Sequence, residues 1–172
     1  MNLIRTIALG AVCFNSIATA QKVVSQYDRA TDFSKFKTYK WIIIQGTTPP
    51  NTAQNVVGLV NTVLGQKGLL LQSEQIEGKA DLLVGFQTSV DQQRQINRLD
   101  TGDPWMGGMG QATTSIIEVG TLVIDMYDLG QKQLVWRGSA TKTLNPGGNP
   151  YKNYERLQKA VDKLLKDFPP KN

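Results

Sequence analysis

Two strand-like segments joined by a four-residue connection constrain the fold of this chain more than any other feature. Residues 116–128 and 133–144 are rich in β-branched and apolar side chains, and residues 129–132 between them contain a glycine. Such a pair of segments with a short connection is typical of an antiparallel β-hairpin. From Leu134 to Ala140 every second position is apolar or glycine, so we expect these positions to share one buried face.

Four further segments have the periodicity of regular structure. Strand-forming residues dominate 38–44, and apolar side chains alternate with polar ones over 80–90. Apolar side chains recur every three or four positions over 51–64 and 151–168, which is the spacing of one face of a helix. Two short extended segments complete the set, residues 21–28 and 69–72.

The order of these elements favours an α+β domain. Leaving aside the short segment 69–72, the order is β-β-α-β-β-β-α, which is incompatible with an all-parallel sheet. We therefore expect two layers, an antiparallel or mixed sheet with two helices packed on one face. Residues 21–172 are expected to form this single α+β domain.

Residues 91–114 interrupt the periodic pattern. This segment is rich in Gln and Asn and contains four glycines, which is typical of a long flexible hairpin loop. It carries Trp105, Met106 and Met109, large apolar side chains that a polar loop cannot bury by itself. They are candidates for contact with a partner or an apolar ligand. The alternative is that they fold back onto the sheet.

Residues 1–20 have the organisation of a secretory signal peptide. A positive start with Arg5 is followed by a short apolar core. Ala18 and Ala20 then form a small-x-small cleavage site before Gln21. We therefore expect an exported protein of the periplasm or cell envelope. The apolar core is too short to span a bilayer as a helix, and no transmembrane span is expected in the mature chain.

Cys13 raises the alternative of a lipid anchor. Lipoprotein signals usually place a branched apolar residue three positions before the cysteine and a small residue directly before it. This chain has Gly10 and Val12 at those positions, so a lipid anchor at Cys13 is not expected. Cleavage before Gln21 would remove the cysteine with the signal peptide.

The chain contains no histidine, and it has a single cysteine. Catalytic triads and dyads that use His are therefore excluded, as are zinc, iron–sulfur and haem sites built from Cys and His. We expect neither a cofactor nor a metal site.

Carboxylates are the acid-base groups that remain. Asp125 and Asp128 lie three apart on one predicted strand, so they should point to opposite faces and form no convergent pair. Asp28 and Asp32 flank a strand start, where turn or capping roles are expected. The sequence thus favours a non-enzymatic protein. The alternative is a hydrolase of cell-wall glycans, which needs two suitably spaced carboxyl groups in a cleft.

The net charge of +5 is modest. Lysines cluster near the first strands and along the last helix, which is typical of a solvated face. The alternative is that these lysines attract anionic lipid head groups or cell-wall polymers. Nucleic acid is not expected as a partner, because no basic platform with interleaved aromatic residues is visible. The two clusters are Lys35, Lys37 and Lys40, and Lys159, Lys163 and Lys166.

Four stretches resemble one bacterial family. They are YDRATDFSKFKTYKW (Tyr27 to Trp41), ADLLVGF, GTLVIDMYDLGQKQLVWRGSATKTL (Gly120 to Leu144) and AVDKLLKDFPPK (Ala160 to Lys171). They are similar to the opening segment, middle strand, closing hairpin and C-terminal helix of the proteins grouped as domain of unknown function 4136. The resemblance implies a secreted or lipid-anchored envelope protein of Gram-negative-type bacteria, and it implies no reaction.

Export, the missing catalytic motifs and this resemblance together indicate a function. We expect an exported, non-enzymatic cell-envelope protein that acts as a binding or assembly accessory. An envelope protein, a lipid or a cell-wall polymer is the expected class of partner.

Overall fold

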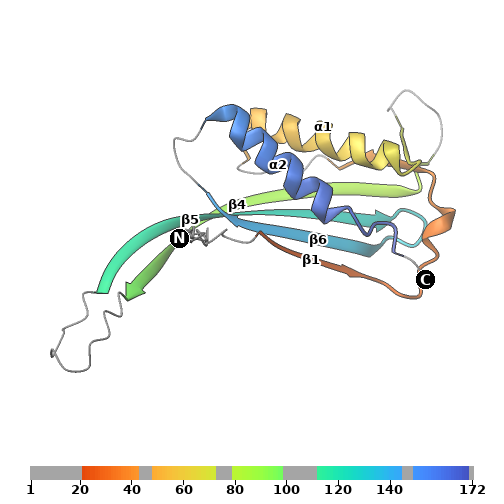
Figure 1. Ribbon diagram of the computed structural model, residues 1–172. Helices are drawn as coiled ribbons and strands as arrows, with labels where there is room; N and C mark the ends of the chain where they lie inside the picture. The colour runs from red at the N-terminus through yellow and green to blue at the C-terminus, as the bar shows by residue number, and fades with distance from the viewer. Residues whose placement is uncertain (1–20, 43–47, 73–78, 99–111, 145–148, 171–172) are drawn as a thin grey trace, which may run out of the picture.

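The computed structural model describes residues 21–42, 48–72, 79–98, 112–144 and 149–170 of the chain. These residues form a six-stranded mixed sheet with the strand order β1-β6-β5-β4-β2-β3. Two helices, α1 and α2, lie side by side on one face of the sheet (Figure 1), so the expected two-layer α+β fold is confirmed. The elements are β1 (Lys22–Tyr27), a short 3₁₀ helix (Phe33–Lys35), β2 (Thr38–Trp41), α1 (Pro50–Gln66), β3 (Leu70–Leu71), β4 (Leu82–Arg98), β5 (Ala112–Asp128), β6 (Gln133–Thr143) and α2 (Pro150–Leu164).

The mixed character of the sheet comes from β2. This strand pairs in parallel with both β3 and β4, whereas β1, β6, β5 and β4 pair antiparallel with their neighbours. A parallel connection needs a crossover, and α1 supplies it between β2 and the strands that follow. Among the described residues, neither helix is long and apolar enough to cross a membrane.

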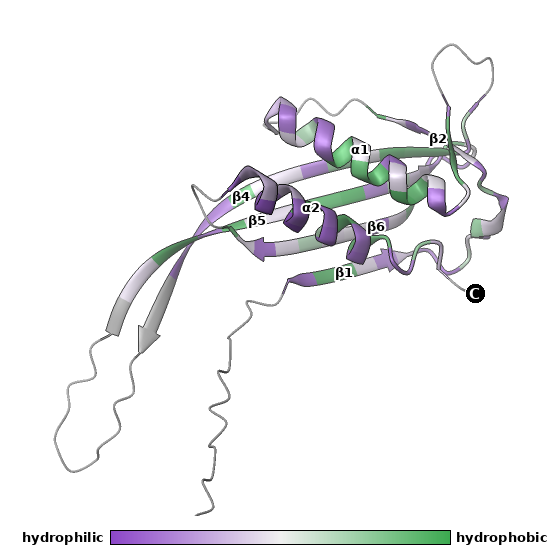
Figure 2. Ribbon diagram, turned by 45° about the horizontal axis from the view of Figure 1, so that its top comes forward, coloured by the Kyte–Doolittle hydropathy of each residue, from purple (hydrophilic) through white to green (hydrophobic). Residues whose placement is uncertain are grey.

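The core lies between the helices and the sheet, where the apolar faces of both layers meet (Figure 2). The buried side of α1 packs on β2 and β4, and Asn61 of α1 accepts hydrogen bonds from Tyr39 Oη and Trp41 Nε1, each at 2.9 Å. The fully buried side chains of the core are Trp136, Tyr39, Leu64, Leu82, Ile124, Met126, Leu165, Val56, Val60, Val84, Val135 and Val161.

The last helix ends earlier than its apolar spacing predicts. It stops at Leu164, although residues up to 168 continue the spacing. Leu165 and Phe168 nevertheless remain in the core, and the Phe168 ring meets the Trp136 ring edge-on at 5.4 Å between centroids. The chain therefore keeps its apolar contacts here while leaving helical geometry.

The prediction that residues 91–114 form a loop is wrong at both ends of that segment. The antiparallel pairing of β4 and β5 continues without a break from Leu82↔Asp128 to Arg98↔Ala112. Residues 91–98 and 112–114 are therefore strand. Residues 92–98 and 112–118 project from the body as a two-stranded ribbon (Figures 1 and 2). Beyond Val119 no third strand pairs with it among the described residues. Residues 91–98 are mostly polar in sequence, so the alternation that marks a half-buried strand is missing there.

A second correction concerns Leu134, which was expected on the buried face with Trp136. The register of β6 against β5 shifts at this point, because Met126 pairs with Trp136 whereas Tyr127 pairs with Leu134. Val135 is the extra residue, and it is buried. One added residue turns the preceding side chain to the opposite face of the sheet. Leu134 is accordingly exposed.

Candidate functional site

Asp125 is held on the sheet face that the helices leave open. It accepts two hydrogen bonds from its cross-strand partner Arg137, at 2.6 Å to Nε and 2.7 Å to Nη2. This hydrogen-bonded pairing raises the pKa of the Arg137 guanidinium above its ordinary value. A carboxylate engaged in this bidentate way serves as a structural acceptor.

Asp128 lies on the other face of β5 and is equally engaged. Its carboxylate accepts Lys35 Nζ at 2.7 Å, Gly130 N at 2.7 Å and Gln131 N at 3.0 Å. Burial would raise the pKa of Asp128, but these hydrogen bonds outweigh burial and hold it below its ordinary value. The two aspartates therefore form no convergent pair, as predicted. Lys35, a member of the first lysine cluster, is occupied by this ion pair.

Asp28 and Asp32 have the turn and capping roles expected of them. Asp28 accepts the Ala30 backbone N–H at 2.9 Å, and Asp32 caps the 3₁₀ helix by accepting the Ser34 N–H at 2.9 Å. The Ala30 hydrogen bond lowers the pKa of Asp28. The pKa of Asp32 is lowered by the Ser34 hydroxyl, which it accepts at 2.7 Å, and by the Ser34 N–H.

Asp81 has a structural role that no local sequence pattern indicates. Its carboxylate accepts the backbone N–H groups of Lys37 and Thr38 at 2.8 and 2.9 Å, and the Thr38 hydroxyl at 3.0 Å. It thereby ties the start of β2 to the start of β4. No local pattern could reveal this contact, because its partners lie more than forty positions away in the chain.

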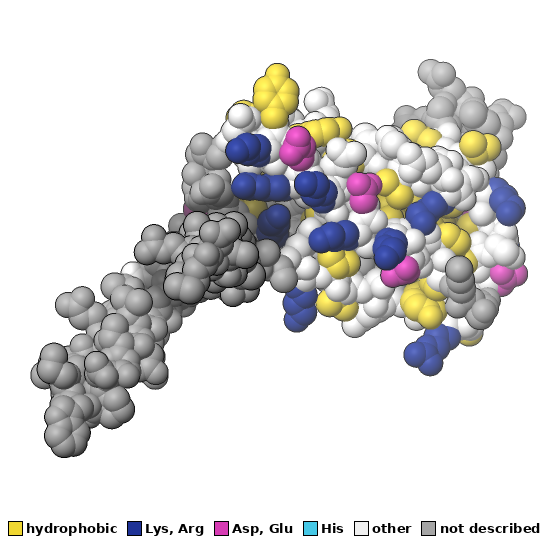
Figure 3. Space-filling view, viewed as in Figure 1, with side chains coloured by type: hydrophobic (Ala, Val, Ile, Leu, Met, Phe, Trp, Pro, Cys, Tyr) yellow, Lys and Arg dark blue, Asp and Glu magenta, His cyan; other side chains and the backbone are white. Residues whose placement is uncertain are grey.

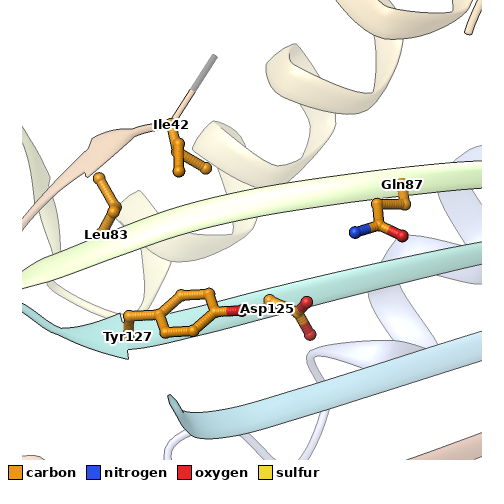
Figure 4. Close-up of a pocket in the computed structure, with 5 residues that line it drawn as sticks. All are labelled: Ile42, Leu83, Gln87, Asp125 and Tyr127. Atoms are coloured by element: carbon orange, nitrogen blue, oxygen red, sulfur yellow. The ribbon is translucent and has the colours of Figure 1, made fainter. Parts of the chain in front are cut away.

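A small hollow lies on the open face of the sheet (Figure 4). It has a volume of about 310 Å³ and is lined by side chains from β4, β5 and the residue after β2. Its one carboxylate among the described residues is Asp125, which Arg137 already holds. The lining residues are Ile42, Leu83, Gln87, Asp125 and Tyr127.

A larger cavity of about 570 Å³ lies between the helices and the sheet. We call it the helix–sheet groove. The N-terminal halves of α1 and α2 form its walls, and adjacent parts of β4, β5 and β6 form its floor. Leu122 and Ala140 lie in the floor, while Leu157 and Ala160 of α2 line a wall. This size falls within the range of about 300–1,000 Å³ that is usual for small-molecule sites.

Small residues make this space available. Ala140 and Ala160 face the groove where longer side chains would fill it. Gly120 also lines it, and a Cβ atom there would stand 2.8 Å from Leu144 Cδ2, so glycine lets Leu144 fold over the strand.

Most of the exposed surface of the groove is apolar, although many of its lining residues are polar and a few are charged. Val90, Leu144 and Tyr154 are large apolar or aromatic residues that line it while 60, 39 and 44% exposed. Among the described residues, its charged side chains are Lys142, Arg156 and Glu118. Figure 3 shows the face that carries α2, where Lys and Arg side chains gather with exposed apolar side chains between them.

The proposed contact residues Trp105, Met106 and Met109 lie outside the described residues, as do the signal-peptide residues 1–20 with Ala18 and Ala20. Gln21 is described and lines the groove. The described part of the chain holds no cluster of three or more His, Cys, Asp or Glu side chains that could bind a metal. The groove could not be predicted from local sequence patterns, because its described lining residues come from six separate segments.

Solved structures of similar fold include proteins from two different organisms. One is a PDZ domain protein from Parabacteroides distasonis, with a TM-score of 0.56 and 14% identity over 88% of this chain and 37% of that chain. Another is the PelC dodecamer from Paraburkholderia phytofirmans, with a TM-score of 0.54 and 12% identity over 89% of this chain and 100% of that chain. At such identities the likeness shows the fold alone.

The sequence comparisons give the family. No curated protein matches this sequence. The family described as "Domain of unknown function (DUF4136)" matches residues 23–170, which is nearly the whole of the domain described above. This match confirms the resemblance seen in the sequence, and the chain belongs to the DUF4136 family.

Proposed function

We propose that this protein is an exported, non-enzymatic binding protein of the cell envelope that holds its ligand in the helix–sheet groove. The observation that carries the proposal is the groove itself, an open concavity of about 570 Å³ with mostly apolar surface beside two helix N-termini. A well-formed apolar cavity with a few polar groups is the usual form of a ligand site. The signal-like residues 1–20 support export to the periplasm or envelope.

The arrangement of carboxylates favours binding over glycan hydrolysis. Glycosidases use two carboxyl groups, about 5–5.5 Å apart in retaining enzymes and about 6.5–9.5 Å apart in inverting ones. Among the described residues, Glu118 is the one carboxylate that lines the groove. Asp81, Asp125 and Asp128 are each engaged in hydrogen bonds that stabilise the fold.

Protein chemistry on the native protein tests export. We expect N-terminal sequencing and intact mass to give a chain that starts at Gln21, recovered from the periplasmic or envelope fraction. A chain that starts at Cys13 with added acyl mass would show a lipoprotein instead. An uncleaved chain in the cytoplasmic fraction would contradict the proposal.

Native mass spectrometry tests binding at the groove. Wild-type protein purified from envelopes should carry a small molecule that is absent from Thr52→Trp, because Thr52 lines the groove and tryptophan would fill its mouth. Thr62→Trp is the matched control, since Thr62 is an exposed residue of the same helix outside the groove lining. Equal loading of all three proteins would contradict the proposed site.

A glycan assay tests the alternative function. Wild-type protein and Glu118→Gln should release no soluble fragments from purified cell-wall glycan. Release by the wild type that the Glu118→Gln change abolishes would establish the hydrolase in place of the binding protein.

A further inference from the structure

We propose that the helix–sheet groove binds an amphiphile with one apolar chain and an anionic head group. The chain would lie against Leu122, Ala140 and Leu157, and the head group would meet Lys142 and Arg156. This inference rests on the proposed function and specifies the chemical class of its ligand.

The exposed apolar side chains of the groove argue for an apolar chain. Val90 is 60% exposed at the edge of the groove, and Leu144 and Tyr154 border the same space. Below them, Leu122 and Ala140 continue the apolar surface into the core. Water beside such a surface is displaced favourably by an apolar ligand. An apolar chain bound in the groove can therefore contact apolar side chains from the rim to the floor.

The charges beside this surface argue for an anionic head group. Lys142 of β6 and Arg156 of α2 both line the groove and are partly exposed, so they are accessible from solvent. Glu118 is the single opposing charge among the described lining residues, which leaves a net charge of +1 there. Long basic side chains can lie along apolar surface while their charged ends reach a carboxylate or phosphate.

The two helix N-termini add to this positive potential. Pro49 and Thr52 of the α1 start and Pro150 and Asn153 of the α2 start all line the groove. Neither helix has an acidic residue in its first turn. The α1 start also has no side-chain cap, whereas Asn149 Oδ1 accepts the Tyr151 N–H at the α2 start. No acidic side chain of either first turn offsets the helix dipoles, so an anion nearby is favoured.

A panel of twelve-carbon amphiphiles tests the head group. Each compound is titrated calorimetrically below its micelle concentration against the mature protein. We expect dodecanoate to bind saturably at one site. Dodecyl maltoside and dodecyltrimethylammonium should bind about tenfold more weakly or worse, because they lose the charge-assisted contacts. Equal affinity for all three compounds would overturn the anionic head group.

Paired charge variants locate that head group. Lys142→Gln with Arg156→Gln should weaken dodecanoate about tenfold and leave dodecyl maltoside unchanged. Lys159→Gln with Lys163→Gln is the matched control, because both are exposed α2 residues outside the groove lining. An equal loss in the control pair would mean that general surface charge attracts the anion, which would overturn the site.

Variants whose side chains fill the groove test where the apolar chain of the ligand lies. Ala160→Leu should abolish dodecanoate binding while the melting temperature shows that the variant is folded, and methyl signals of Leu122 and Leu157 should shift on titration of the wild type. Thr52→Trp is the second blocking variant, should Ala160→Leu fail to fold. If a folded blocking variant still binds dodecanoate as tightly as the wild type, the inference is overturned. It is also overturned if the wild-type protein binds phosphatidylglycerol vesicles but no single dodecanoate molecule.

The two proposals can fail separately. If dodecanoate does not bind, but envelope-purified wild type carries a molecule that Thr52→Trp lacks, the amphiphile is wrong and the binding function stands. If neither is observed, both proposals are wrong.

Discussion

The indole ring of Trp136 lies over the backbone of Gly138, two residues further along β6. A Cβ atom on residue 138 would overlap Trp136 Cη2, and it would stand 3.0 Å from Trp136 Cζ2 and 3.0 Å from Leu164 Cγ, which is tighter than most real Cβ contacts. Glycine at this position therefore lets a buried tryptophan lie flat against its own strand and meet α2. Arg137, between them, points to the opposite face and holds Asp125. The segment Trp136 to Gly138 therefore packs against α2 on one face of the sheet and holds an ion pair on the other face.

We expect Gly138→Ala to destabilise the protein by about 1–3 kcal/mol, the usual range for overpacking a core. The added methyl group would have to displace Trp136 or Leu164, both of which are buried. Chemical denaturation followed by circular dichroism measures the change. Gly58→Ala is the control, because a Cβ on this α1 residue meets nothing within 4 Å. It should be neutral or stabilise by up to about 1 kcal/mol, and a loss at Gly58 equal to that at Gly138 would contradict the packing argument.

The fold follows from the sequence wherever one face of an element is buried. The alternation over 80–90 and the three-to-four spacing of α1 are visible because Leu82, Val84 and Val56 must avoid water. The outer part of β4, residues 91–98, is invisible for a different reason, since its sequence is mostly polar and shows no alternation. The shift at Val135 is also hidden, because one extra residue is recognised only against its paired strand.

The candidate site could be predicted only in part. The structural roles of Asp28 and Asp32 are local, so the turn pattern indicates them. The groove depends on small residues, Gly120, Ala140 and Ala160, that lie on three different elements. Their proximity follows from the order of strands in the sheet, which the element order alone leaves open.

The pair of Asp125 and Arg137 should show energetic coupling in a double-mutant cycle. Arg137→Gln removes both donors from a carboxylate whose side chain is 5% exposed, and we expect a loss of about 1–3 kcal/mol. The Arg137 side chain is 46% exposed, so solvent screening should place the loss in the lower part of that range. Asp125→Asn in the Arg137→Gln background should cost less than it does alone. Additive losses would show that the two side chains do not act together.

Asp128 should make the stability depend on pH in the acid range. A carboxylate whose folded-state pKa is lowered stabilises the fold above its unfolded pKa of about 3.9, and that contribution is lost as the pH falls through the lower folded-state pKa. The difference in unfolding free energy between wild type and Asp128→Asn should therefore be present at pH 7 and shrink below about pH 4. Denaturation at several pH values measures it, with Asp167→Asn, an exposed acid, as control. A difference that stays constant down to pH 3 would contradict the role of the carboxylate.

Leu164 should contribute strongly to stability, because this α2 residue is 2% exposed and packs against Gly138 of the sheet. We expect Leu164→Ala to cost about 2–5 kcal/mol, the usual range for a buried leucine. Lys163→Ala on the exposed side of the same helix is the control and should cost less than about 1 kcal/mol. A loss below about half a kcal/mol for Leu164→Ala would mean that helix α2 is not packed on the sheet in solution.

The ribbon should exchange its amide hydrogens faster than the body of the same strands. Two-stranded antiparallel pairs are marginally stable in water, whereas three or more strands with a covered face are stable. Amides of residues 92–94 should therefore exchange much faster than those of residues 83–86, which lie in the body of the six-stranded sheet. Hydrogen exchange at several protein concentrations measures this difference. Protection of the ribbon that equals the body and grows with concentration would contradict the isolated ribbon and show that a second copy of the chain covers it.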